Sequence, residues 1–217
     1  MAYYPIFLEL KGRRCVVIGG GRVAEGKIEG LVAAEADVTV VAPGLTPALR
    51  DLIDAGRIRH EARAYRDGDL AGYALCFVAT DDVAVNARVA AEAKRRGVWV
   101  NVADDPAHCD FILPAVIRQG QVVLAASTGG ASPALARRLR EELTAFLSED
   151  FARLADLLGD VRRELRERRV SVDADAWQRA IDARLRALLA QSRLDEARQH
   201  LLERLGLAEG AAARREE

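Results

Sequence analysis

VVIGGGRVAEGK, residues 16 to 27, decides the fold of this 217-residue chain. Three glycines follow an apolar strand and precede a helix-forming run, which fits the G-x-G-x-x-G/A pattern of dinucleotide sites. Gly19 permits a tight turn, Gly21 lets a pyrophosphate approach the backbone, and Ala24 keeps the helix close to the sheet. The first helical amides then face phosphates with the positive end of the helix dipole. The predicted cofactor contacts in this stretch are Gly19, Gly20, Gly21, Arg22, Val23 and Ala24.

The second predicted strand, residues 37–42, lacks part of this fingerprint. An acidic residue about 20 positions beyond the glycines normally binds the ribose hydroxyls of NAD. Here the strand runs into Ala42, Pro43 and Gly44, and no arginine stands there to bind a 2′-phosphate. We therefore place Ala42 and Pro43 in the cofactor site, while the choice between NAD and NADP stays open.

Composition and charge limit the function classes. A hydrophobic content of 50% supports a folded core, with room for one dinucleotide domain and a smaller appendage. The net charge of −1 argues against a general nucleic-acid binder. No basic leader and no apolar run of about 18 residues opens the chain, so neither export nor membrane spanning is expected.

The cysteines and histidines predict a protein of the reducing cytoplasm that holds no resident metal. Three cysteines, two of them in predicted strands, are typical of small core residues rather than of a disulfide framework or zinc site. The three histidines are far apart, so no ligand cluster is expected. These residues are Cys15, Cys76, Cys109, His60, His108 and His200.

The first 110 or so residues alternate strands with helices, the pattern of a parallel sheet covered on both faces. The predicted strands are 14–18, 37–42, 58–62, 74–79 and 98–102, and the predicted helices are 22–34, 46–55 and 83–96, the last ending at Gly97. Two polar loops follow the fourth and fifth strands, at the carboxyl edge where such sheets bind ligands. They place Thr80, Asp81 and Asn101 in the cofactor region, and Asp104 beside it.

After Pro106 the pattern changes. The apolar runs 111–118 and 121–127 predict a hairpin that turns at Gln119-Gly120, with Pro114 marking an edge or bulged strand. A polar glycine loop, 127–133, then leads into a helix with Ser132 as N-cap and Pro133 in its first turn.

From there to about residue 207 the chain is predicted to be almost wholly helical, and the last residues are expected to fray. An apolar stripe runs along this region at Leu154, Leu157, Leu158, Val161 and Leu165. We expect the region to be too thin for a core of its own, so that a partner covers the stripe. The partner is either the chain's own dinucleotide domain or, as we favour, a second copy in a homodimer.

Several motifs together resemble the dehydrogenase module of siroheme synthases, a family of precorrin-2 dehydrogenases. The matching stretches, in order, are VVIGGGRVAEGK, VTVVAP, FVATDD with Asn86, VNVADDP, CDFILPA and STGGASPALARRLRE. The resemblance implies an α/β fold with an NAD-binding Rossmann-like parallel sheet, a small middle β/α segment that helps build the active site, and a helical dimerisation segment. We set these domains at 1–112, 113–147 and 148–217.

The resemblance also implies a reaction, in which NAD removes two hydrogens from precorrin-2 to give sirohydrochlorin. Some members also insert Fe2+ to give siroheme, and whether this chain does so stays open. The expected ligands are thus precorrin-2, sirohydrochlorin and, if iron is inserted, Fe2+. With 217 residues there is no room for the methyltransferase to which some members are fused, so we expect that enzyme to be a separate protein.

Asp104 is the predicted catalytic residue, because oxidation of the macrocycle releases a proton and this aspartate matches the N-V-x-D motif of the family. The alternative is that Asp104 and Asp105 only form an Asx turn before Pro106. The substrate carries eight carboxylates in this family, which predicts an anion cradle in the second glycine loop and the helix after it. Its members are Ser127, Thr128, Gly129, Gly130, Arg137 and Arg138, with Arg118 as a further possible partner and a simple helix cap as the alternative.

Two other functions compete with this one. The first is a non-catalytic NAD(H)-responsive binding protein that acts through its helical tail. The second is a dehydrogenase for a different small substrate. An acidic group beside the nicotinamide favours the enzyme over the sensor, and the lack of a large catalytic domain argues against the second alternative.

Overall fold

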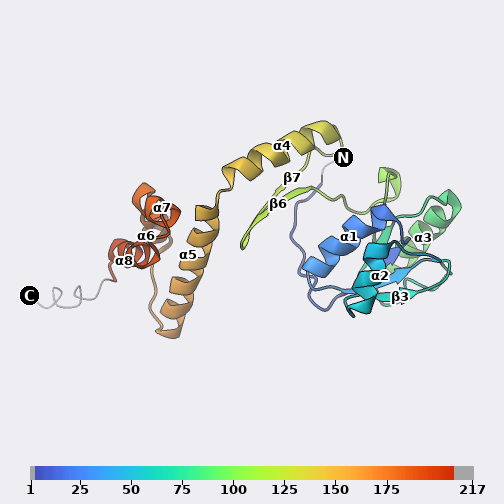
Figure 1. Ribbon diagram of the computed structural model, residues 1–217, viewed down its shortest axis with the longest axis horizontal. Helices are drawn as coiled ribbons and strands as arrows, with labels where there is room; N and C mark the ends of the chain where they lie inside the picture. The colour runs from blue at the N-terminus through green and yellow to red at the C-terminus, as the bar shows by residue number, and fades with distance from the viewer. Residues whose placement is uncertain (1–2, 208–217) are drawn as a thin grey trace, which may run out of the picture. The chain divides into compact units, whose positions relative to one another are not determined.

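The computed structural model describes residues 3–207. The chain divides into two compact units, Met1–Leu113 and Pro114–Glu217 (Figure 1). The division lies one residue from the predicted boundary at 112/113. The second predicted boundary, at 147/148, falls between two helices of the second unit, and the predicted frayed end lies outside the described residues.

The first unit is built on a five-stranded, fully parallel sheet with the order β3-β2-β1-β4-β5. The chain therefore has the α/β architecture that the alternating pattern predicts, and each helix and strand lies within two residues of its predicted bounds. The strands are β1 (Arg14–Ile18), β2 (Asp37–Val41), β3 (Arg59–Glu61), β4 (Leu75–Val78) and β5 (Trp99–Val102). The helices are α1 (Arg22–Ala33), α2 (Pro47–Asp54) and α3 (Val83–Arg96).

Two apolar layers cover this sheet. Cys15 and Val17 of β1 belong to the layer with α1 and α2, whereas Val16 and Ile18 belong to the layer with α3. This alternation follows from the two-residue period of a strand that is buried on both faces. Cys15 and Cys76 are fully buried free thiols, as predicted for small core residues, and burial raises the pKa of Cys15 to about 11.

Helix ends in this unit follow local chemistry. The Asp82 carboxylate accepts hydrogen bonds from the amides of Ala84 and Val85 and so caps α3. At the other end Gly97 has φ +67°, the left-handed conformation that closes a helix at low cost in glycine. The helix therefore starts directly after the loop that follows β4, at the carboxyl edge of the sheet.

The second unit begins with an antiparallel hairpin, β6 (Ala115–Gln119) and β7 (Val122–Ala126). The predicted start at residue 111 was wrong, because the strand begins only after Pro114, which has no amide to donate. The predicted turn was also off by one residue. Gln119 pairs with Val122, so the turn residues are Gly120, with φ +56°, and Gln121.

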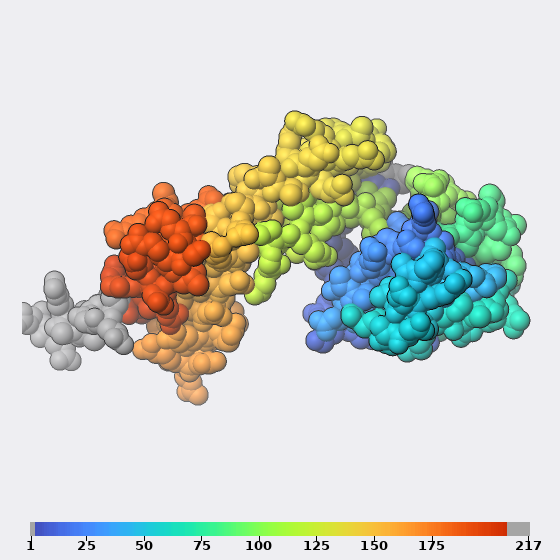
Figure 2. Space-filling view, viewed as in Figure 1, coloured from blue at the N-terminus to red at the C-terminus, as the bar shows by residue number. Residues whose placement is uncertain are grey.

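Up to residue 207, the last that the structure describes, five helices follow the hairpin. Helix α4 (Pro133–Phe146) is capped by Ser132 with Pro133 in its first turn, as predicted. Figure 2 shows the closely packed later helices in orange and red. They are α5 (Glu149–Glu167), α6 (Ala174–Ala180), α7 (Ala183–Ala190) and α8 (Leu194–Arg204).

These later helices have a core of their own, which corrects the expectation that a partner covers the apolar stripe of α5. Leu154, Val161 and Leu165 are buried, and the half-buried Leu157 and Leu158 pack against the same cluster. The cluster is completed within the unit by residues of α6, α7 and α8, among them Ala180, Leu185, Leu189, Ala197 and Leu201. The chain leaves the helical conformation before α6 and before α7, and Asp173 and Asp182 cap the helices that follow. These interruptions let the short helices fold back onto α5.

None of the described helices combines the length and apolar character needed to cross a membrane. Within residues 3–207 there is also no group of three or more histidine, cysteine or acidic side chains arranged to hold a metal ion.

A buried carboxylate ties the segment before β4 to α3. Glu92 is only 1% exposed. It accepts hydrogen bonds from the Tyr65 hydroxyl (2.5 Å), the Gly68 amide (3.0 Å), the Leu70 amide (3.4 Å) and Arg96 Nε (2.5 Å). Burial alone would raise the pKa of Glu92, but these four donors outweigh it and leave the pKa below its usual value.

We expect Glu92→Gln to destabilise the first unit by about 2 kcal/mol, because an amide cannot accept from all four donors. Since the folded pKa is lowered, the carboxylate stabilises above the unfolded value of about 4.3, and this contribution is lost as the pH falls through the folded pKa. Urea unfolding followed by Trp99 fluorescence in a Trp177→Phe background measures both effects. Glu29→Gln, an exposed change on α1, is the control. Equal pH dependence in wild type and Glu92→Gln would contradict this role.

Candidate functional site

The glycine turn after β1 is built from two close backbone contacts. A Cβ on Gly19, which has φ +116°, would lie 2.2 Å from the carbonyl oxygen of Ala79. One on Gly20 would lie 2.2 Å from the carbonyl oxygen of Gly44. The first two glycines are therefore required by packing, because no side chain fits between the turn and the loops that follow β2 and β4.

Gly21 differs from its neighbours, because a Cβ there would meet nothing within 4 Å. It is the N-cap residue of α1, and no capping side chain accepts a hydrogen bond from the first amides of this helix. The 12-residue α1 thus presents free amides and the positive end of its dipole to open space. This is the arrangement that a pyrophosphate needs, so the residues present fit a dinucleotide.

Ala42 and Pro43, predicted near the ribose, follow β2 directly. Ala42 is buried, Pro43 is exposed, and the Ala42 carbonyl lies 2.9 Å from His60 Nε2. Sequence reasoning gave His60 no role. Its place one strand away, on β3, is visible only in the folded sheet, where it holds the end of β2 in position.

Thr80 and Asp81 follow β4 at the same edge. The Thr80 hydroxyl donates to Asn86 Oδ1 at 2.6 Å, and Asn86 Nδ2 donates to the Thr80 carbonyl at 3.0 Å. The side chain of Thr80 also borders the glycine turn, since its Cγ2 would lie 3.4 Å from a Cβ on Gly19. Asn86 thus orders the loop, while Asp81 is exposed. The cofactor roles of Thr80 and Asp81 stay predictions.

Asn101 lies inside β5 and is 8% exposed. Its Nδ2 donates to the Phe111 carbonyl at 2.9 Å, which ties the returning chain to the strand. The Val102 amide similarly donates to the Cys109 thiol at 3.1 Å. Cys109 was predicted only as a core residue, but its half-buried thiol closes the turn after β5. A direct cofactor contact by Asn101 stays a prediction.

Asp104 and Asp105 have different environments. The Asp105 carboxylate lies 2.6 Å from His108 Nδ1. The Asp104 carboxylate is exposed and has no hydrogen-bond partner among residues 3–207. Within this pair only Asp104 is free to accept a proton from a ligand.

Asp104 also has an unusual backbone. Four described non-glycine residues have positive φ, and three of them lie directly after helix ends, where this conformation closes the last turn. Asp104, with φ +58°, instead follows a strand. The four are Glu35, Asp104, Arg169 and Ser192. An aspartate tolerates this conformation better than most residues do, so the turn presents a carboxylate at little cost.

The predicted anion cradle lies in the second unit, between β7 and α4. The Ser127 hydroxyl accepts from the Gly129 amide at 3.1 Å, and the Thr128 hydroxyl accepts from the Ser132 amide at 3.2 Å. Gly129 and Gly130 have φ of +63° and +88°, so the loop needs glycine at both positions. The two hydroxyls therefore shape the loop, and the substrate contacts stay predictions.

The three arginines considered near this loop differ in their pairing. Arg138 Nε donates to Glu142 at 2.7 Å along α4. Arg137 and Arg118 are exposed and make no ion pair within the part of the chain that the structure describes. Arg137 is therefore better suited than Arg138 to bind a ligand carboxylate.

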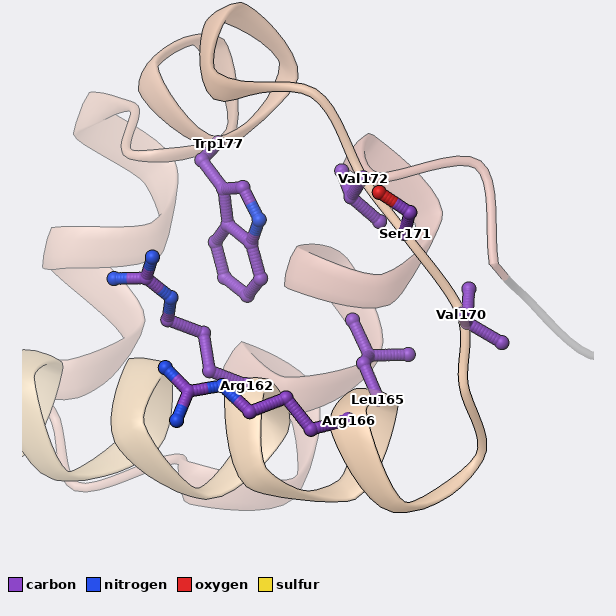
Figure 3. A pocket seen from close by; sticks show the side chains of 7 residues that line it. All are labelled: Arg162, Leu165, Arg166, Val170, Ser171, Val172 and Trp177. Atoms are coloured by element: carbon purple, nitrogen blue, oxygen red, sulfur yellow. The ribbon is translucent and has the colours of Figure 1, made fainter.

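A hollow elsewhere in the second unit contains none of the predicted site residues (Figure 3). Trp177 of α6 points into it, with Arg162 and Arg166 of α5 below, and the Arg162 guanidinium lies 5.7 Å from the indole centroid. Apolar contacts from Leu165, Val170 and Val172 complete its wall.

Comparison with known proteins identifies both units. The family model described as "Putative NAD(P)-binding" matches residues 6–115, and the model "Sirohaem biosynthesis protein central" matches residues 124–145. Among solved structures, "SirC, precorrin-2 dehydrogenase" is similar with a TM-score of 0.76 and 30% identity, covering 93% of this chain and all of that one. The chain belongs to the siroheme synthase dehydrogenase family.

Longer relatives share the same region. A siroheme synthase of Methylococcus capsulatus is 42% identical over 218 residues, which covers 100% of this chain and 45% of that protein. A siroheme synthase of Photobacterium profundum is 39% identical over 204 residues, 93% of this chain and 44% of that protein. The chain thus spans about half the length of these curated relatives.

For this member of the siroheme synthase dehydrogenase family we expect Gly21→Asp to fold normally, because the position is open, yet to bind NAD at least about tenfold more weakly. The added carboxylate would repel the pyrophosphate and occupy its space. Calorimetric titration with NAD measures the affinity.

Gly26→Asp is the matched control, since it makes the same change at another open position of α1. Unchanged NAD affinity in Gly21→Asp would mean that the phosphates bind elsewhere.

Proposed function

We propose that this chain oxidises precorrin-2 to sirohydrochlorin with NAD as the hydride acceptor. The observation that carries the proposal is the free Asp104 carboxylate, held at the carboxyl edge of a sheet whose glycine turn leaves α1 open to a pyrophosphate. Likeness to SirC and to the siroheme synthases supports the choice of substrate.

The reaction removes one hydride and one proton from the macrocycle. NAD, when bound, supplies the acceptor for the hydride. The chain's own contribution is to bind the pyrophosphate at the amides of α1 and to take the proton on a carboxylate oxygen of Asp104. The Asp105 carboxylate is already paired with His108 Nδ1, which leaves Asp104 as the acceptor.

We also propose that the second unit binds carboxylates of the substrate. The loop from Ser127 to Gly130 is held open by two positive-φ glycines, and Arg137 follows it on α4 without an acidic partner among the described residues. Backbone amides and a free guanidinium are suitable donors for a polycarboxylate.

Iron insertion is a second activity that we assign to the same site. In this proposal Fe2+ enters as a substrate that the four macrocycle nitrogens bind. Asp104 then accepts one of the two pyrrole protons that iron displaces, and the other passes to water.

A homodimer is the assembly that we propose. Three large apolar side chains remain exposed on the hairpin and α4 of the second unit: Val116 (39%), Leu135 (50%) and Phe146 (62%). A second copy would cover them.

We place the protein in the cytoplasm, where the free thiols of Cys15 and Cys76 stay reduced.

Asp104→Asn is expected to lower kcat for precorrin-2 oxidation by about 10²- to 10⁴-fold, because the amide cannot accept the proton. Asparagine tolerates positive φ, so folding and NAD affinity should be unchanged. Anaerobic incubation with precorrin-2 and NAD, followed by tetrapyrrole absorbance and NADH, measures the oxidation. Fe2+ added afterwards tests siroheme formation against a protein-free control.

Asp105→Asn is the matched neighbour and should retain most of the oxidation. Near-normal turnover in Asp104→Asn would remove that residue from the mechanism. If the wild type oxidises nothing with NAD or NADP yet binds NAD, the non-catalytic NAD(H)-responsive binding protein becomes the better description.

Phe146→Ser is expected to shift the proposed dimer toward monomer, measured by sedimentation velocity over a range of concentrations. Leu194→Ser, at a side chain that is 54% exposed on α8, is the control and should leave the assembly unchanged. A wild type that is monomeric throughout would contradict the homodimer.

A further inference from the structure

Lys27 has an environment unlike that of an ordinary surface lysine. It lies in the second turn of α1, where its side chain is half-buried and Nζ lies 6.0 Å from the ring centroid of Phe77 in β4. Phe77 is itself buried and packs edge-on against Phe111, with ring centroids 5.5 Å apart. The ammonium therefore lies above the ring of Phe77 and does not extend fully into solvent.

This ammonium has no direct counterion. Within residues 3–207 the Lys27 side chain makes no ion pair or hydrogen bond, whereas Nζ of the exposed Lys11 lies 2.8 Å from Glu35. Burial lowers the pKa of Lys27, and the nearby Cys109 and Asp104 offset this effect in part. The cation is therefore partly desolvated over Phe77, which pairs with Asn101 of β5, three residues before Asp104. No acidic group among residues 3–207 is bonded to it.

A partly buried, unpaired ammonium costs free energy that a bound anion would recover. The cofactor phosphates are not that anion, because they belong at the first turn of α1. Lys27 lies six residues beyond Gly21, about 9 Å along the helix axis at 1.5 Å per residue. An anion near both Lys27 and Asp104 is therefore best supplied by the molecule that Asp104 deprotonates.

We propose that the Lys27 ammonium binds a carboxylate of the tetrapyrrole substrate next to Asp104. The inference rests on the proposed function, whose substrate is a polycarboxylate. Lys27 would then select for carboxylated macrocycles and fix one edge of the ring relative to the proton acceptor. The aromatic ring of Phe77 supports the lysine stem and limits its freedom before the ligand arrives.

Lys27→Met tests the proposal, because methionine keeps the length and apolar stem but removes the charge. We expect the KM for precorrin-2 to rise about 10- to 100-fold, the loss expected for one charge-assisted hydrogen bond, with kcat changed by less than about threefold. NAD affinity should be unchanged. Lys27→Arg should recover most of the lost affinity, and Lys94→Met, at an exposed lysine of α3, should behave as wild type.

A second readout does not need turnover. Sirohydrochlorin is titrated anaerobically into each variant and followed by absorbance, and its dissociation constant should rise in Lys27→Met but not in Lys94→Met. If the wild type fails to oxidise precorrin-2, the proposed function fails, yet this titration still decides the role of Lys27.

Equal tetrapyrrole affinity in wild type and Lys27→Met would overturn the inference. So would a selective loss of NAD affinity, which would assign Lys27 to the cofactor, or an equal loss in Lys94→Met, which would indicate a general charge effect. A fall in kcat at constant KM would place Lys27 in the chemistry instead. Thermal unfolding checks that each variant folds. If the Lys27→Met variant does not fold, Lys27→Gln takes its place in the same measurements.

Discussion

Backbone contact at the glycine turn is the constraint on which the first unit depends. The turn touches the loop after β4 through Gly19 and the loop after β2 through Gly20, in each case at a distance that excludes a side chain. These contacts join the loops that follow three neighbouring strands, whose carboxyl ends parallel pairing places at one edge. The same turn leaves Gly21 open. One short stretch thus both closes the sheet edge and creates the space above α1 into which an anion fits.

Most of the first unit was predictable because its signals are local. A strand buried on both faces reads as an apolar run, the Gly97 cap marks a helix end, and the glycine pattern fixes what lies between β1 and α1. Errors were largest where pairing decides the bounds. The hairpin strand β6 starts four residues later than expected, because Pro114 cannot donate and the register is set by pairing with β7.

The parts of the molecule that the sequence did not reveal depend on contacts between distant residues. Periodicity located the apolar stripe of α5 but could not show what covers it. Three short helices do so, and the periodicity within each helix does not show which surface that helix covers. In the site, His60 acts through the Ala42 carbonyl 18 positions earlier, and Cys109 acts through the Val102 amide. No sequence motif predicts either contact, so only the folded chain assigns these two side chains their roles.

The acidic pair after β5 shows how one turn can give two adjacent carboxylates different tasks. Asp105 is satisfied by His108 and holds the short 3-10 turn that follows, Pro106–His108. Asp104, at positive φ, has no hydrogen-bond partner among residues 3–207. This carboxylate therefore adds no hydrogen bond to the described fold. This conformation leaves Asp104 the free acceptor that the proposed proton transfer needs, and the role proposed for Lys27 is to hold an anionic, proton-releasing ligand near that carboxylate.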